Sequence, residues 1–75
     1  MDDLAIQRRV ERTIQQCRDF NMETDARTVA EIMADEDIVA EKYEPLSAER
    51  ALAFVEYEKA AGHALRRLRV DRRSA

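Results

Sequence analysis

The chain has 75 residues, a formal net charge of −3, 39% charged residues and a single cysteine. This length allows one small domain at most, and a single cysteine excludes an internal disulfide. One His and one Cys also fall short of the roughly four ligands of a structural zinc site. With one Gly and one Pro, the composition strongly favours helix, and we expect an all-α fold.

Neither the apolar segments nor the first residues of the sequence suggest a membrane protein. No apolar run approaches the roughly 20 residues that a membrane span requires. The chain starts with Met1, Asp2 and Asp3, which is acidic where a signal peptide is basic. We therefore expect a cytoplasmic protein that makes no membrane contact.

The first helix is predicted to run from about residue 3 to residue 20. Its apolar stripe recurs at spacings of three and four residues and comprises Ile6, Val10, Thr13, Cys17 and Phe20. Asn21 is the expected stop, because Asn tolerates the left-handed conformation that ends many helices. Cys17 is expected inside, where a free thiol behaves as a small apolar residue.

The second helix is predicted over residues 25–43, with Thr24 or Asp25 as its cap. If it were continuous, Glu36 would fall on its apolar face and Ile38 on the opposite side. A break near residues 34–36 removes both conflicts, so we favour a broken helix with an acidic corner. A continuous helix with Glu36 at its margin is the alternative.

The third helix is predicted over residues 47–70, with Ser47 as its cap and with residues 71–75 frayed. Its predicted apolar face comprises Ala51, Phe54, Val55, Ala61, Leu65 and Leu68. Gly62 costs about 1 kcal/mol relative to Ala within a helix, which suggests close approach of another helix, either within the monomer or across a dimer axis. The expected fold is a bundle of three main helices, and a homodimer is an attractive way for so small a core to bury more surface.

Charge is distributed unevenly along the chain. Residues 23–59 hold eleven acids and four bases, whereas residues 60–75 hold one acid and five bases. Our first hypothesis is a non-enzymatic regulator or inhibitor that docks an acidic and apolar helical surface on a larger protein, with a protein that handles nucleic acid as one candidate. The residues expected to contact that partner are Asp35, Glu36, Asp37, Glu41 and Glu44.

The alternative hypothesis is a transcriptional regulator that binds nucleic acid through its basic C-terminal end. Its contacts would be Arg66, Arg67, Arg69, Arg72 and Arg73, which suit phosphates but lack an interleaved aromatic for stacking on bases. A helix-turn-helix over residues 28–43 is disfavoured, because its reading helix would be acidic and DNA would repel it.

No set of residues predicts catalysis, a bound metal or a cofactor. His63 is the only histidine, and no Asp, Ser or Cys lies close to it in the sequence. The run Asp35, Glu36 and Asp37 lacks the alternate spacing, the Gly and the closing Glu of a calcium loop. We expect no enzymatic activity.

Overall fold

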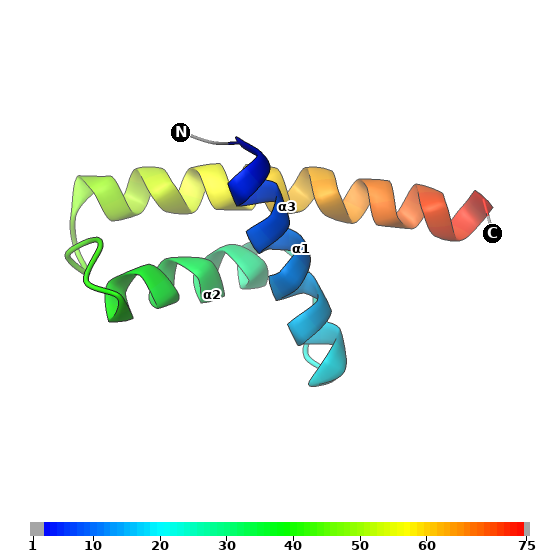
Figure 1. The fold of residues 1–75 in the computed structure, drawn as a ribbon, viewed down its shortest axis with the longest axis horizontal. Helices are drawn as coiled ribbons and strands as arrows, with labels where there is room; N and C mark the ends of the chain where they lie inside the picture. Colours follow the sequence, from blue (N-terminus) through cyan, green and yellow to red (C-terminus); the bar gives the residue numbers. More distant parts are fainter. Residues whose placement is uncertain (1–2, 75) are drawn as a thin grey trace.

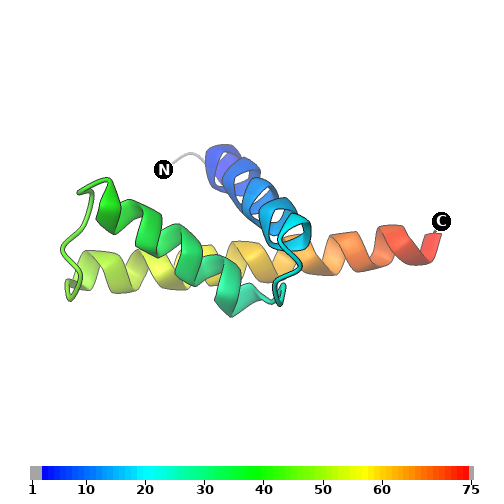
Figure 2. The ribbon, with the colours of Figure 1, turned by 90° about the horizontal axis from the view of Figure 1, so that it is seen from below.

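The chain folds into three helices, α1 (Asp3–Asp19), α2 (Ala26–Val39) and α3 (Ala48–Ser74). The computed structural model describes the backbone of residues 3–74 and the side chains of residues 4–68. Helices α2 and α3 run antiparallel and side by side, and α1 lies obliquely across them (Figures 1 and 2). The predicted all-α three-helix bundle is confirmed. Within residues 3–74, every helix is too short or too polar to span a bilayer.

Side chains cap the starts of α2 and α3 as predicted. The Asp25 carboxylate accepts a hydrogen bond from the backbone N–H of Thr28 at 2.8 Å. The Ser47 hydroxyl oxygen accepts one from the N–H of Arg50 at 3.1 Å. Both bonds satisfy a backbone donor that has no partner inside the helix, so the sequence fixes these two starts locally.

Helices α1 and α2 end in the same way, at residues in the left-handed conformation. Asn21 has φ 56°, and Glu41 has φ 61°. In each case the next N–H reaches back to the helix: Met22 N–H to Cys17 O at 2.8 Å, and Lys42 N–H to Asp37 O at 2.9 Å. This is the Schellman arrangement. The prediction of Asn21 as a stop is confirmed, whereas Glu41 is an unexpected residue for such a position.

The favoured break near residues 34–36 is wrong, because α2 continues unbroken to Val39. The acid that points into the core is Asp37, and Glu36 is exposed. Asp37 has buried polar partners, so no break is needed to remove its charge from the core. The helix also ends four residues before the predicted residue 43, at the turn around Glu41. No second short helix follows in residues 40–47, which leaves no helix-turn-helix there.

The core consists mainly of small and medium-sized side chains. Its buried apolar members are Val10, Ile14, Cys17, Val29, Ala30, Met33, Ala53, Tyr57, Ala61 and Ala64. The apolar stripe predicted for α1 is confirmed except for Phe20, which is 76% exposed. Phe20 follows the last residue of α1, where the chain turns away from the bundle.

Helix α3 is rotated relative to the predicted face and runs further. Of the predicted face, Ala61 is buried and Phe54, Leu65 and Leu68 pack partly buried against the core, whereas Ala51 and Val55 are exposed. The helix also buries Ala53, Tyr57 and Ala64, which were not predicted as members of this face. The buried set follows the stripe that meets α1 and α2, on which Tyr57 finds its polar partners. The backbone of α3 is helical through Ser74, four residues past the predicted end, and no Gly or Pro follows Leu68 to stop it.

Of the two expected ways for a helix to approach Gly62 closely, the one within the single chain is wrong. A Cβ atom built on Gly62 would meet no heavy atom within 4 Å, so this position faces open space. Within the single chain, Gly62 therefore has no packing role that offsets its low helix propensity.

Replacing Glu41 by Gly should stabilise the fold. A Cβ in the left-handed region costs about 1–2 kcal/mol, and Gly avoids that cost while losing more chain entropy on folding. We expect Glu41→Gly to raise the free energy of unfolding by about 1 kcal/mol in urea denaturation. Glu41→Gln is the matched control, because it removes the charge and keeps the Cβ. An equal gain in both variants would contradict a backbone origin.

Candidate functional site

Three polar side chains, one from each helix, meet in the interior. Arg9 of α1 forms an ion pair with Asp37 of α2, with Nη2 2.9 Å from Oδ1. Arg9 Nη1 donates to the hydroxyl of Tyr57 on α3 at 3.1 Å, and this hydroxyl in turn donates to Asp37 Oδ2. Arg9 Nη2 also donates to the Met33 carbonyl at 3.0 Å. This Arg9–Asp37–Tyr57 network joins all three helices.

The network satisfies a carboxylate that is otherwise removed from water. The Asp37 side chain is only 2% exposed, and the ammonium of Lys42 approaches its Oδ1 at 3.8 Å from the solvent side. The Arg9 guanidinium also lies over the Tyr57 ring, 5.2 Å from the centroid. Burial and the hydrogen bond to Asp37 raise the pKa of Tyr57 to about 12, against the opposing effect of Arg9. The Tyr57 hydroxyl therefore stays protonated and keeps its donor for Asp37.

Sequence reasoning missed this network, although a signal was present. Val29, Met33 and Asp37 follow one another at steps of four residues, which places the acid on the buried face of a continuous helix. Arg9 sits directly before Val10 on the apolar side of α1, and Tyr57 supplies a hydroxyl from α3. A buried acid predicts a basic partner on another helix, but the partner's identity depends on how the helices cross.

The other acids of the predicted partner surface are exposed. Asp35, Glu36, Glu41 and Glu44 all face solvent at the end of the molecule where α2 turns into α3. The same segment of the chain, residues 35–46, also holds two exposed apolar side chains: Val39 is 84% exposed, and Leu46 is fully exposed. We call these six residues the acidic end. Asp37 belongs to the core and is not available to a partner in this fold.

Asp35 already has an intramolecular neighbour. Its Oδ1 lies 3.7 Å from Arg50 Nη2, at the surface between α2 and α3. Such an exposed pair contributes little to stability, because solvent screens it. The carboxylate of Asp35 is 72% exposed and remains accessible from solvent.

The basic residues predicted for a nucleic-acid contact are only partly described. The side chains of Arg69, Arg72 and Arg73 lie outside the described residues. Arg66 is exposed, and its Nη2 lies 3.2 Å from Nδ1 of His63. Arg67 is turned toward α1, where it pairs with Glu11 at 3.5 Å. With the Gln7 amide oxygen facing it, Arg67 Nη1 also donates to Gln7 at 2.8 Å.

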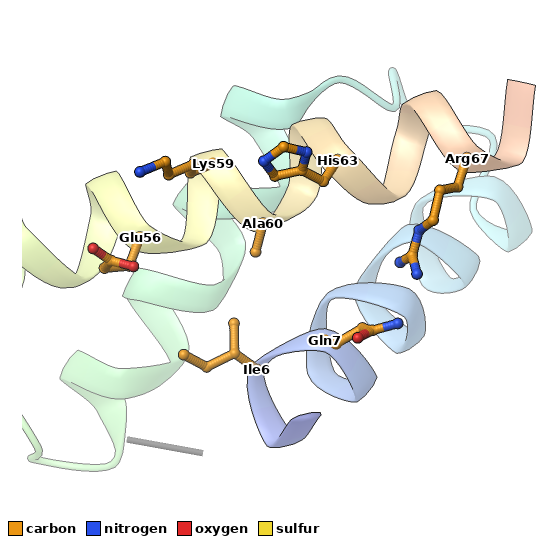
Figure 3. A pocket seen from close by; sticks show the side chains of 7 residues that line it. All are labelled: Ile6, Gln7, Glu56, Lys59, Ala60, His63 and Arg67. Carbon is orange, nitrogen blue, oxygen red and sulfur yellow. The ribbon is translucent and has the colours of Figure 1, made fainter. Parts of the chain in front are cut away.

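An open groove of about 430 Å³ lies between α1 and α3 beside this contact (Figure 3). Ile6 and Ala60 point toward one another across its floor, and Gln7 and Arg67 face each other at one end. Its lining residues are Ile6, Gln7, Glu56, Lys59, Ala60, His63 and Arg67. The groove thus combines a small apolar floor with charged walls of both signs.

This groove supplies no assembled catalytic set among its described side chains. His63 lines it, but its neighbour at Nδ1 is a guanidinium rather than the carboxylate that orients a catalytic imidazole. None of the lining residues carries a hydroxyl or a thiol. Among the described residues, no group of three or more His, Cys, Asp or Glu side chains is placed to hold a metal ion.

The only cysteine is unreactive in its position. Cys17 is 1% exposed and belongs to the core cluster that residues of all three helices form. Burial, with the nearby charge of Asp25, raises the pKa of its thiol. Since the thiolate is the nucleophile, the folded state suppresses Cys17 chemistry.

Comparison of the chain with protein-family models, with curated proteins and with solved structures finds no match. The structure therefore defines the structural class of this protein and no functional family. The chain is a three-helix protein with a buried ionic network and an exposed acidic end, and its function must be argued from these features.

Removing one partner of the network should destabilise the fold. Arg9→Met leaves the buried Asp37 carboxylate without its main counter-charge, and we expect a loss of about 3 kcal/mol in the free energy of unfolding. Asp37→Leu should cost less, because Arg9 is 21% exposed and its guanidinium can reach water. Urea denaturation of both single variants and of the double variant measures the coupling. A double variant whose loss equals the sum of the single losses would show that the pair does not interact.

Stability should fall at high pH through Tyr57. A group whose pKa is raised on folding stabilises the fold fully below its unfolded pKa of about 10, and this contribution is lost as the pH rises toward the folded value. With the Tyr57 pKa at about 12 in the fold, the wild type should lose up to about 2 kcal/mol more than Tyr57→Phe between pH 9 and pH 12. If the free energies of unfolding of the two proteins changed equally with pH over this interval, the assignment would be disproved.

Proposed function

We propose that the chain is a small non-enzymatic regulator that binds a larger protein through its acidic end. The partner surface that fits this end is basic with an apolar centre. A groove that otherwise holds nucleic acid has this chemistry, so the chain would act as a competitor for such a groove. The single observation that carries the proposal is the exposure of Val39 and Leu46 in the same segment as four exposed acids.

Exposed apolar side chains and charges play different parts in such a contact. Burying Val39 and Leu46 supplies the non-directional part of the affinity, at roughly 25 cal/mol per Å² of apolar surface removed from water. The carboxylates of this segment raise the rate of encounter with a basic partner and fix the orientation of docking. Lys42 is the one base in the same segment, and its ammonium is directed toward Asp37.

The fold presents this end on a stiff support. Both helices that flank residues 40–47 are fixed locally, α2 by its Schellman end and α3 by the Ser47 cap. The Arg9–Asp37–Tyr57 network anchors the last turn of α2 to the other two helices. A preorganised surface loses less conformational entropy when it binds.

Neutralising the acidic end should abolish partner capture. The variant carries Asp35→Asn, Glu36→Gln, Glu41→Gln and Glu44→Gln, which keep the shapes of the side chains and remove four charges. Affinity capture from the source cell, followed by mass spectrometry and by calorimetry with the purified partner, measures the effect. We expect at least a tenfold weaker dissociation constant, which corresponds to about 1.4 kcal/mol.

The matched control removes the same number of charges elsewhere, with Glu11→Gln, Asp19→Asn, Glu23→Gln and Glu31→Gln. All four of these residues are exposed. A partner that is retained by the control and lost by the acidic-end variant supports the proposal. Equal binding by both variants would reject the acidic end as the contact.

The alternative function, nucleic-acid binding through Arg66 and its neighbours, has less support from the described side chains. Arg67, the second described arginine of that set, is directed toward Glu11 and Gln7. A gel-shift titration with duplex DNA at low salt distinguishes the two functions. Binding that weakens steeply with salt would favour the alternative over the protein-binding role.

A further inference from the structure

Helix α3 has an outer face that no other part of the described chain covers. This face carries Ala51, Leu52, Val55 and Gly62. Leu52 is 68% exposed and Val55 is 58% exposed, although both are large apolar residues. The face lies on the opposite side of α3 from Ala53, Tyr57, Ala61 and Ala64, which pack against α1 and α2.

Val55 and Gly62 are matched in position along this face. They are seven residues apart, which is close to two full turns, so both point in nearly the same direction. One carries an exposed branched side chain, and the other leaves open space where a Cβ would stand. A knob and a gap two turns apart are self-complementary when two copies of the helix lie antiparallel.

The charges of α3 are also self-complementary in the antiparallel sense. Residues 48–58 hold three acids and one base, whereas residues 59–74 hold six bases and one acid. Two parallel copies would place like charges together. Two antiparallel copies place the acidic half of each helix beside the basic half of the other, which is favourable and selects the orientation.

We propose that the outer face of α3 is the interface of a two-fold symmetric homodimer, in which Val55 of each copy packs over Gly62 of the other. This register places the two-fold axis between residues 58 and 59. It brings Glu58 of one copy beside Lys59 of the other, and Glu49 near Arg66. A second copy thereby gives Gly62 the close helix contact that the single chain lacks.

The named contacts of this interface use no residue of the acidic end. In the antiparallel pair, the turns that join α2 to α3 lie at opposite ends of the assembly, since each precedes the start of its own α3 (Figure 1). The dimer would present two copies of the proposed partner-binding surface. The interface itself does not depend on that function, because it shares no residue with the acidic end.

The first test is the mass of the protein in solution. Sedimentation equilibrium of the wild type should give twice the chain mass of 8.7 kDa at high micromolar concentration. A mass that stays at the single-chain value up to millimolar concentration would overturn the proposal. Gly62→Leu fills the gap on the outer face and should shift the dissociation constant at least tenfold toward monomer.

We expect Gly62→Leu to keep the fold of the single chain, because nothing lies within 4 Å of the added Cβ. Circular dichroism should confirm unchanged helicity. Gln16→Leu, at an exposed position of α1, is the matched control and should leave the wild-type mass unchanged. A Gly62→Leu variant that dimerises as well as the wild type would place the interface elsewhere and reject the proposed face.

Exchanging charges between the two halves of α3 tests the register by restoring dimerisation as well as by removing it. One variant carries Glu49→Lys and Glu58→Lys, and the other carries Lys59→Glu and Arg66→Glu. Each variant by itself places like charges across the interface and should be monomeric. An equimolar mixture restores opposite charges and should form a heterodimer, whereas a mixture that stays monomeric would reject the antiparallel register.

Discussion

A single carboxylate, that of Asp37, determines how the three helices can pack. Its burial is tolerable only because Arg9 and Tyr57 reach it from the other two helices. A rotation of α1 or α3 that broke either contact would leave a charge in the core with fewer partners. The ionic network therefore selects one helix arrangement among those that small apolar side chains alone would allow.

The composition of the core shows why this selection is needed. Seven of the ten buried apolar residues in the cluster are Ala, Cys or Val. Small side chains let helices approach closely, but they interlock less distinctly than large ones do. Arg9 also donates a hydrogen bond to the carbonyl of Met33. This bond fixes the position of α1 against the backbone of α2 as well as against its side chains. Polar contacts thus supply orientation, and apolar burial supplies most of the driving force.

Local chemistry was predictable from the sequence, and tertiary chemistry was not. Asp25, Ser47 and Asn21 act on backbone groups within a few residues, so their types reveal where helices begin and end. Asp37 looked like one more solvated acid, since its partners lie 28 residues before it and 20 residues after it. The rotation of α3 depends on the same contacts. The position of Val55 therefore could not follow from periodicity alone, because the wheel of α3 offers apolar residues on two sides.

The three consecutive acids at residues 35–37 lie partly in the core and partly at the surface of the molecule. Asp37 holds the bundle together, and its sequence neighbours Asp35 and Glu36 are exposed to solvent. Changes in the outward acids alter the electrostatic field of this end while leaving the packing unchanged. The same run of three acids therefore contains both a position that the fold constrains and two positions that the fold leaves free to vary.

The enclosed thiol of Cys17 gives the chain a built-in reporter of its own opening. Because it is the only sulfhydryl and is buried in the core that the three helices share, a modifying reagent can reach it only when this core opens. The rate of labelling would then report how often the native core opens, without any engineered probe.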